Sequence, residues 1–472
     1  MQFMKEIFKW SLLAFAVLFV AACSNDDDND GEVKLNPTAL FLDWGETATV
    51  SFSGVNIKTY SLGSYPEGWP EPVINMANRT LTVTAPEQND ELATIGSVRL
   101  NGVTKGGELI GASLYVALNV EEVDFSEQPA NCYLTPKPNT HYTFDATIKG
   151  NGQGTINPDH LAVIWQTGRN LVQYLNYEDG KCSFYISSDN DEKKYLVPGN
   201  ALIGAYDADN NLLWSWHIWM ADYNPAEDAL NYGNYTVMSR QLGALLNNTE
   251  DQDSTLKSYG LYYQWGRKDP FPGPASYNAA SSFTTTLYDG NYNTVTLSAI
   301  SSEEGGSYEY AHANPTHFIT TEQKDADWCR TITNEVKGWS ATTKTINDPC
   351  PYGWRVAPVS AFVNLTIADD LTLDGQHYAN QYGWTLTDGT TSSFYFAAGR
   401  RIYLDGTIQN LYDDSLVRNV AMEAQPWVGY NWTADGKAFV YWMKKDEVSK
   451  SGLRTDFALG RANGASVRCV RE

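Results

Sequence analysis

“KTINDPCPYGWRVAPVSAF”, residues 344–362, is the stretch that says most about how this chain folds. Its prolines and Gly353 predict a tight turn, because these residue types favour the backbone angles that turns need. Trp354 and Val356 follow at alternate positions, which predicts a half-buried strand. “PVSAFVNL” can then form a short helix. The stretch therefore predicts a turn, a strand and a short helix in succession.

The sequence on both sides of this stretch predicts further strands. “ALIGAY” (201–206) and “LLWSWHIWM” (212–220) predict a hairpin, whose second strand is apolar on both faces and therefore central. “SSFYFAAGRRIYLDGTI” (392–408) predicts a strand, a glycine break and a second strand that runs to an Asp-Gly turn. “FVYWMKK” (439–445) and “ASVRCVRE” (465–472) complete a late sheet.

Several of these phrases occur in an order that resembles a known family. “NCYLTPKPNTHYTFDA” (131–146), “YGLYYQWGRKDPFPGP” (259–274), the opening stretch and “GASVRCVRE” (464–472) resemble the Fibrobacter succinogenes major paralogous domain. That domain is found in fimbrillin-like surface lipoproteins of Bacteroidetes, and the resemblance covers roughly residues 128–472. It implies a C-type-lectin-like, loop-rich α+β fold whose first and last strands pair. We expect a β-rich part at 124–250 and the C-type-lectin-like domain at 251–472.

Five cysteines remain if Cys23 is acylated, and an extracellular setting permits them to form disulfides. The preferred pair is Cys350–Cys469, which the resemblance supports by placing Cys469 in the last strand opposite Cys350. Cys329–Cys350 is the rival pairing, and Cys132–Cys182 is a further option. An odd count leaves at least one cysteine unpaired in a monomer.

Residues 33–123 predict a separate all-β module. “TATVSFSG” (47–54), “RTLTVTAP” (79–86) and “ASLYVALNV” (112–120) are strand-like runs, and turn residues recur between them. “PEGWP” (66–70) followed by “RTLTVTAP” resembles the Ig-like modules of Bacteroidetes surface proteins, including the carbohydrate-associated BACON family. The fold class is therefore mainly β with α+β: an N-terminal Ig-like β-sandwich and then the C-type-lectin-like region. We interpret the sandwich mainly as a spacer.

The first residues predict the location of the protein. Residues 1–22 have the basic, apolar and small-residue order of a secretory signal, and “VAAC” (20–23) resembles a bacterial lipobox that would make Cys23 the lipidation site. “SNDDDND” (24–30) resembles the acidic export signal of Bacteroidetes lipoproteins, and it would also be solvated as a spacer. We therefore expect a lipidated tether at 23–32 and an outer-membrane protein that faces the extracellular side, held through its lipid anchor.

Composition narrows the classes of partner. The formal net charge of -23 argues against nucleic acid, and 42% apolar residues can supply folded cores. Aromatic residues make up 13% of the chain, and Tyr and Trp suit both half-buried strands and sugar-stacking surfaces. In loop-like stretches, Trp265, Phe271, Tyr352, Trp384 and Trp432 are the candidate ligand-stacking aromatics, although each can instead belong to the framework.

No catalytic or metal-binding pattern is complete. “DADNN” (207–211) has the first ligands of a calcium loop but lacks its glycine and its last acid, so it predicts a hairpin turn. His217 has no credible relay partner nearby in the sequence and is expected to be a hydrogen-bonded core residue. His312 and His317 are expected in loops. We predict no cofactor, no metal and no enzyme, since the active cysteine pair of formylglycine-generating enzymes, which share the fold, is also missing.

The function that remains is binding or adhesion, with a glycan or a host protein as ligand. One alternative is an accessory, anchor or tip component of a fimbria, and another is an enzyme on the same fold. Shaft subunits in these bacteria mature by cleavage after an N-terminal arginine. The first arginine here is Arg79, which we expect inside a strand, so a shaft role is disfavoured.

Overall fold

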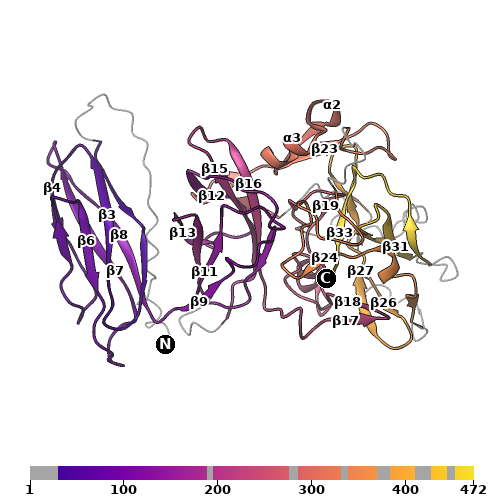
Figure 1. Ribbon diagram of the computed structural model, residues 1–472, viewed down its shortest axis with the longest axis horizontal. Coiled ribbons are helices and arrows are strands. Elements are labelled where there is room, and N and C mark those ends of the chain that lie inside the picture. Colours follow the sequence, from indigo (N-terminus) through magenta and orange to yellow (C-terminus); the bar gives the residue numbers. More distant parts are fainter. Residues whose placement is uncertain are drawn as a thin grey trace, which may run out of the picture. The chain divides into compact units, whose positions relative to one another are not determined.

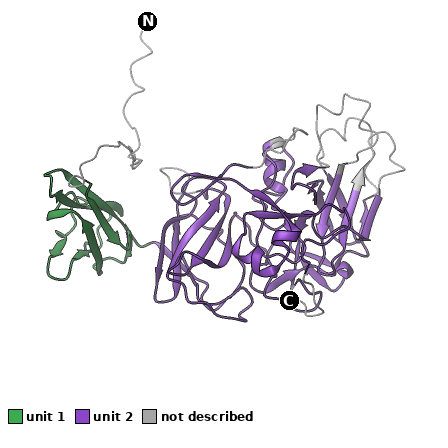
Figure 2. Ribbon diagram, turned by 90° about the horizontal axis from the view of Figure 1, so that it is seen from above, with its two compact units in different colours: residues 1–119 green, residues 120–472 purple. Residues whose placement is uncertain are grey.

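The computed structural model describes residues 30–188, 195–275, 285–330, 338–368, 383–409, 427–443 and 452–472. It divides the chain into two compact units, residues 1–119 (unit 1) and 120–472 (unit 2), which Figure 2 shows in different colours. The predicted boundary at residue 123 falls on strand β9 (Glu121–Asp124), which pairs with β11 (Thr140–Asp145) of unit 2.

Unit 1 is a sandwich of two four-stranded sheets. One sheet has the order β1-β3-β6-β5, with β1 (Glu32–Asn36), β3 (Thr47–Val55), β6 (Thr80–Thr84) and β5 (Val73–Asn75). The other has the order β2-β8-β7-β4, with β2 (Ala39–Leu42), β8 (Leu109–Leu118), β7 (Ile95–Thr104) and β4 (Ile57–Leu62). Alternate residues of both sheets, such as Val50 and Leu114, meet in one apolar core. The predicted sandwich is confirmed.

We expected Arg79 inside a strand, and this prediction is wrong. Arg79 is exposed in the turn between β5 and β6, with a φ of 52°, and its carbonyl accepts a hydrogen bond from the Phe52 N–H at 2.9 Å. The turn extends through Arg79, so the alternating strand begins at Thr80, one residue later than the sequence suggested.

Unit 2 consists of several smaller sheets joined by long loops (Figure 1). The largest described sheets follow the orders β10-β16-β15-β12-β20-β21 and β29-β28-β33-β30-β31-β32, with β19 also paired to β33. The bounds of the strands in these two sheets are β10 (Cys132–Leu134), β12 (His160–Gln166), β15 (Gly199–Tyr206), β16 (Leu212–Met220), β19 (Tyr263–Gln264), β20 (Leu287–Tyr288), β21 (Thr294–Val295), β28 (Arg400–Arg401), β29 (Ile408–Gln409), β30 (Trp427–Trp432), β31 (Ala438–Met443), β32 (Gly452–Phe457) and β33 (Gly464–Val467).

The smaller sheets have the orders β13-β14-β11-β9, β17-β18-β34-β24, β25-β26-β27 and β22-β23. Their remaining strands are β13 (Gln173–Glu178), β14 (Lys181–Ile186), β17 (Leu230–Tyr232), β18 (Tyr235–Val237), β22 (Ser298–Ser301), β23 (His317–Thr320), β24 (Trp354–Val356), β25 (Thr366–Ile367), β26 (Gly383–Thr387), β27 (Ser392–Phe396) and β34 (Cys469–Arg471). The described helices are short: α1 (Gln252–Ser258), α2 (Ser302–Gly305), α3 (Tyr308–Ala313) and a 3₁₀ turn at Val359–Ala361. The mainly β, loop-rich fold class is thus confirmed.

The opening stretch forms the elements that its residues predict. Gly353 has a φ of 75° in the turn, β24 follows at once, and the 3₁₀ turn takes the place of the short helix. β24 pairs with the last strand, β34, so Val356 lies opposite Cys469. The predicted hairpin is also present, because β15 pairs with β16, and β16 lies between β15 and β10 inside its sheet.

Candidate functional site

A cavity of about 370 Å³ opens in unit 2 where three pieces of chain meet. The β20–β21 hairpin supplies one wall, β22 and β23 supply a second, and the turn between β28 and β29 supplies the third. The lining residues are Thr285, Thr286, Leu287, Thr294, Val295, Thr296, Leu297, Ser298, Ala299, Phe318, Arg401, Asp405, Gly406 and Thr407.

Local turn chemistry explains the shape of two of these walls. In the β20–β21 hairpin, the Asp289 carboxylate accepts hydrogen bonds from the backbone N–H groups of Asn291 (2.8 Å) and Asn293 (2.9 Å). In the β28–β29 turn, Asp405 accepts from the N–H (2.9 Å) and the hydroxyl (2.7 Å) of Thr407. In both turns an aspartate carboxylate therefore stabilises the turn by accepting hydrogen bonds from backbone N–H groups two or four residues later.

Gly406 brings the β28–β29 turn close to β23. Its φ of 76° lies in the left-handed region, and a Cβ placed there would lie 3.0 Å from Cδ1 of Phe318. A side chain at this position would thus crowd Phe318 and strain the backbone, so the close approach of this turn to β23 favours glycine.

Arg401 is the cation of the cavity, and only 5% of it is exposed. Its guanidinium donates to the carbonyls of Gly406 and Pro272, each at 2.7 Å. Burial lowers the pKa of Arg401 to about 10, which leaves the guanidinium charged at neutral pH. It forms no ion pair with an acid in the described ranges of the chain, and its buried Nε has no hydrogen-bond partner there.

The cavity is suited to binding a polar ligand. Six of its lining residues, five threonines and Ser298, carry hydroxyl groups, which both donate and accept hydrogen bonds, and Leu287, Val295 and Phe318 are apolar residues beside them. Among the described residues, no histidine or cysteine lines it, and no group of three or more His, Cys, Asp or Glu side chains gathers anywhere to hold a metal. This arrangement favours hydrogen-bonded recognition.

Four of the five predicted ligand-stacking aromatics are framework residues, so the prediction is wrong for them. Phe271 and Trp432 are fully buried, Trp384 is 1% exposed and Trp265 is 8% exposed. The indole N–H groups of Trp265 and Trp432 donate to the carbonyls of Thr433 (3.0 Å) and Tyr263 (2.8 Å). These rings cannot present a face to a ligand because the protein already covers both faces. Tyr352, in the turn before β24, is 53% exposed, and its role remains a prediction.

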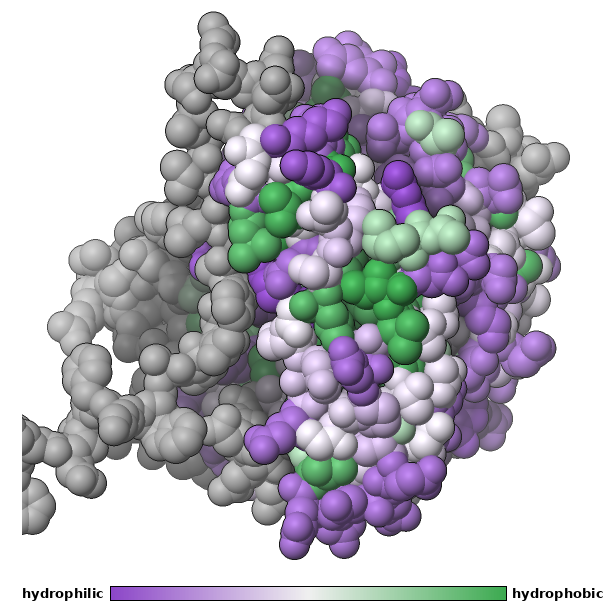
Figure 3. Space-filling model, turned by 90° about the vertical axis from the view of Figure 1, so that its left-hand side faces the viewer, coloured by the Kyte–Doolittle hydropathy of each residue, from purple (hydrophilic) through white to green (hydrophobic). Residues whose placement is uncertain are grey.

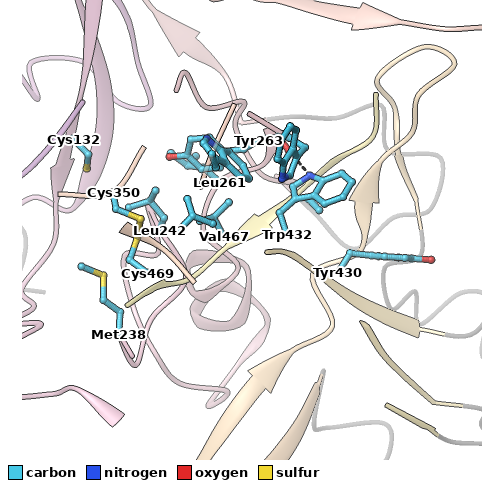
Figure 4. Packing of buried hydrophobic residues seen from close by; sticks show 14 of the residues in the cluster. Cys132, Met238, Leu242, Leu261, Tyr263, Cys350, Tyr430, Trp432, Val467 and Cys469 are labelled. Carbon is cyan, nitrogen blue, oxygen red and sulfur yellow. Dashed lines mark hydrogen bonds between the residues drawn. A yellow bond between two sulfur atoms is a disulfide. The ribbon is translucent and has the colours of Figure 1, made fainter. Parts of the chain in front are cut away.

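The preferred disulfide is present. Cys350 and Cys469 are bonded, with their Cα atoms 6.0 Å apart, so the rival pairing of Cys350 with Cys329 is excluded. Figure 4 shows the bond packed beside Leu242 and Val467, with Cys132 nearby in the same apolar cluster. Cys132 and Cys182 are buried thiols, so the further option that paired them is wrong.

Lys344 organises the turn that carries Cys350. Its ammonium donates to the carbonyls of Cys350 (2.7 Å), Pro351 (3.1 Å) and Trp354 (2.5 Å). It also lies 3.4 Å from the buried carboxylate of Asp348, which in turn accepts from the N–H groups of Cys350 and Val356. One cation thus holds most of the carbonyls of the turn.

His217 lies in the core, as its sequence context indicates. It is 1% exposed on β16, its Nε2 lies 2.9 Å from Oδ1 of Asn200, and burial lowers its pKa to about 3. A histidine that stays neutral and sealed is unsuited to acid–base work at neutral pH. “DADNN” forms the predicted turn, since Asp207 accepts from the backbone N–H groups of Asp209 and Asn211.

His312 and His317 are not loop residues. His312 lies in α3, where Nε2 is 2.6 Å from Oδ1 of Asn347, and His317 begins β23, where Nδ1 is 2.8 Å from the Tyr310 hydroxyl. The two elements are short and lie on either side of Pro315, so neither shows a clear periodic pattern in the sequence. Burial, with Lys268 as a second cause, lowers the pKa of His312 to about 4.

Lys268 and Asp269 form a buried ion pair at the junction of the early and late parts of unit 2. Nζ of Lys268 lies 2.6 Å from Oδ1 of Asp269, and both side chains are almost fully buried. The ammonium also donates to the Ser215 carbonyl at 2.9 Å and lies over the Trp214 ring. Burial lowers the pKa of Lys268 to about 8, although the adjacent Asp269 opposes this shift. The pair is sealed from solvent, which points to a structural role.

The sequence did not single out the cavity, although a signal was present. “TTTLYDGNYNTVTLS” (284–298) is dense in threonine and contains the Asp-Gly turn of the hairpin. Cys23 lies outside the described residues. In the part of the chain that the structure describes, no helix is long and apolar enough to cross a membrane.

Comparisons with known proteins leave the family open. No protein-family model matches the chain, and no curated protein matches it either. The resemblance to the Fibrobacter succinogenes major paralogous domain therefore stays a prediction.

Solved structures give matches of low similarity. The D00-D0 domain of intimin is 12% identical over 40% of this chain and 96% of that chain, with a TM-score of 0.17. The human desmocollin-1 ectodomain is 11% identical over 45% of this chain and 46% of that chain, with a TM-score of 0.16. Protocadherin gamma B2 cadherin domains 1–5 are 12% identical over 45% of this chain and 42% of that chain, with a TM-score of 0.15. TM-scores this low carry no argument about function.

Proposed function

We propose that the protein is a lipid-anchored, surface-exposed outer-membrane protein that binds a glycan without catalysing a reaction, and that the cavity of unit 2 is its binding site. The observation that carries the binding proposal is the lining of this cavity by threonine and serine hydroxyls around the buried cation Arg401. Polyhydroxylated ligands exchange hydrogen bonds with such groups in both directions.

Paired Thr→Val substitutions test the site, because valine keeps the shape of threonine and removes its hydroxyl. The protein is the mature chain with Cys23→Ser, which removes only the predicted acylation site, and it is screened on a glycan array. Thr294→Val with Thr296→Val should weaken binding of a positive glycan about tenfold, at about 0.5–1.5 kcal/mol for each hydrogen bond lost.

A matched pair in unit 1 is the control. Thr49→Val with Thr82→Val removes two hydroxyls from an outward-facing sheet surface and should leave glycan binding unchanged. Equal weakening by both pairs would contradict a site in the cavity. Silence on every glycan, together with co-purification with fimbrial subunits, would contradict glycan binding and favour the accessory role in a fimbria.

The anchor is tested separately in the native bacterium. Cys23→Ser should release the protein from the membrane fraction, and intact cells should expose the wild-type protein to added protease. Retention of Cys23→Ser in the outer membrane would contradict lipid anchoring through this residue.

A further inference from the structure

The two ends of the unit 1 sandwich differ in chemistry. At the first end lie the start of the described chain at Asp30, the β3–β4 turn around Asn56, the β5–β6 turn (76–79) and the β7–β8 turn (105–108). Hydrogen bonds join these pieces, since Asn56 donates to the Asp30 carbonyl at 3.1 Å and the Lys105 N–H donates to the Asn56 carbonyl at 2.8 Å. We call this the tether end.

The opposite end is formed by loops 43–46, 63–72 and 85–94 and by the exit of the chain at Asn119. The Gly45 N–H donates to the Pro86 carbonyl, the Trp69 indole donates to the Ala93 carbonyl, and the Asn119 N–H donates to the Leu42 carbonyl. We call this the exit end. The ten residues of β8 separate the two ends by about 33 Å at ~3.3 Å per residue.

Charge separates the two ends. The three loops of the exit end contain no Lys or Arg, and their acidic residues are all exposed: Asp43, Glu46, Glu67, Glu71, Glu87, Asp90 and Glu91. The tether end exposes Lys58, Arg79 and Lys105, and none of these has an acidic partner among the described residues. Asp30 and Glu108 lie there too, and Glu32 is paired with Lys34 at 3.0 Å, so the balance at this end is slightly positive.

Exposed apolar side chains lie at both ends of unit 1: Tyr65 (38%) and Val73 (62%) lie in or beside an exit-end loop, and three others lie at the tether end. Val55 is 58% exposed, Met76 is 53% exposed and Leu109 is 66% exposed, and each lies in or beside one of its turns. Figure 3 shows that apolar residues reach the surface in separate patches between polar ones on the face that it draws. Apolar residues beside cations are the pattern of a membrane-surface contact.

The length of the tether brings this end to the membrane. Seven peptide steps separate Cys23 from Asp30, which reach at most about 25 Å when fully extended. With Cys23 acylated, Asp30 at the tether end is the described residue that the chain holds closest to the anchor. The exit end, with its acidic loops, would be repelled by an anionic surface.

We propose that the tether end of unit 1 is a membrane-contact surface: Val55, Met76 and Leu109 enter the headgroup layer of an anionic bilayer, and Lys58, Arg79 and Lys105 contact its phosphates. This inference rests on the proposed lipid anchor. It adds an orientation, because a unit seated on its tether end projects its exit end, and the chain that leaves it, away from the lipid.

The test uses the full mature lipoprotein reconstituted in vesicles that contain phosphatidylglycerol. An environment-sensitive fluorophore is attached to Leu109→Cys in one sample and to Tyr65→Cys, in an exit-end loop, in another. We expect a blue shift and quenching by headgroup-labelled lipid at position 109 and neither effect at position 65. Unmodified protein controls for labelling of the buried native thiols.

Charge removal sharpens the test. Lys58→Gln with Arg79→Gln and Lys105→Gln, or vesicles of uncharged lipid, should reduce the blue shift at position 109 while the protein still floats with the vesicles. Equal water exposure at positions 109 and 65 in floating protein would overturn the contact surface and leave the anchor intact. Failure to float would instead refute the anchor at Cys23.

The acidic tether is the other occupant that the cations could attract. If the label at position 109 is protected in the Cys23→Ser protein without vesicles, and Asp26→Asn with Asp27→Asn and Asp28→Asn removes that protection, the tether covers this end. That result would overturn the membrane contact.

Discussion

In unit 1 the buried core is mainly aliphatic, and residues such as Val50, Leu81, Val98 and Leu114 reach it by simple alternation along two sheets. In unit 2 the interior also contains charged groups, among them the Lys268–Asp269 pair and Arg468, which lies 3.8 Å from the Tyr395 ring. A core of the first kind tolerates many apolar sequences. A core of the second kind depends on particular partners, because an unpaired buried charge is costly. Unit 2 should therefore be the more sensitive of the two to single changes.

The largest expected effect comes from removing the disulfide of unit 2. Cys350→Ser with Cys469→Ser opens a loop with a sequence separation of 119, which costs about 5 kcal/mol in the chain-entropy description. Urea unfolding followed by a probe in each unit should show a lower midpoint for unit 2 only. An equal shift of unit 1 would contradict the separation into two independently stabilised units.

The next largest effect is expected from Lys268→Met. This change leaves the Asp269 carboxylate buried without its cation, and breaking a buried pair costs about 3–5 kcal/mol. Lys257→Met is the matched control, since its pair with Asp253 is exposed and should contribute less than about 1 kcal/mol. Similar losses of unfolding free energy in the two variants would show that burial does not determine how much an ion pair contributes to stability.

Acid should weaken unit 2 through His217. The pKa of His217 is about 3 in the folded protein and about 6.5 in the unfolded chain. Between these two pH values the unfolded chain therefore binds a proton that the folded protein does not bind. Stability is complete above pH 6.5 and falls as the pH drops toward 3, by about 1.4 kcal/mol per pH unit from this residue. Between pH 6.5 and 5, His217→Gln should therefore lose about 2 kcal/mol less than the wild type in urea titrations. Identical pH dependence in both proteins would contradict a neutral His217.

The smallest effect is expected on the surface of unit 1. Thr49 and Thr82 share a hydrogen bond of 2.9 Å across two strands, and an exposed cross-strand pair of this kind contributes less than about 1 kcal/mol. Thr49→Ala should thus shift the unit 1 transition only slightly in calorimetry and should leave that of unit 2 in place. A loss as large as that of Lys268→Met would contradict the contrast between the two units.

The sequence predicted best where local rules decide the structure. Alternation predicted the sandwich, and turn residues predicted the strand at Trp354–Val356 and the Asp-Gly turn at Asp405. It failed where the outcome depends on distant partners. Trp432 looks exposed in its local context but is buried in an apolar cluster, where its indole N–H donates to the carbonyl of Tyr263, 169 residues away. The cavity is also assembled from segments more than a hundred residues apart, so the threonine-rich stretch at 284–298 did not show which other residues complete the site.

Lys344 stabilises the turn before β24 without a bound metal ion. Its ammonium satisfies three carbonyls and a carboxylate, the kind of oxygen cluster that proteins often fill with calcium. A cation that belongs to the chain cannot be diluted, chelated or exchanged, whatever the ionic composition of the surrounding medium. The conformation of this loop, and of the cysteine that it carries, therefore does not depend on an external metal ion.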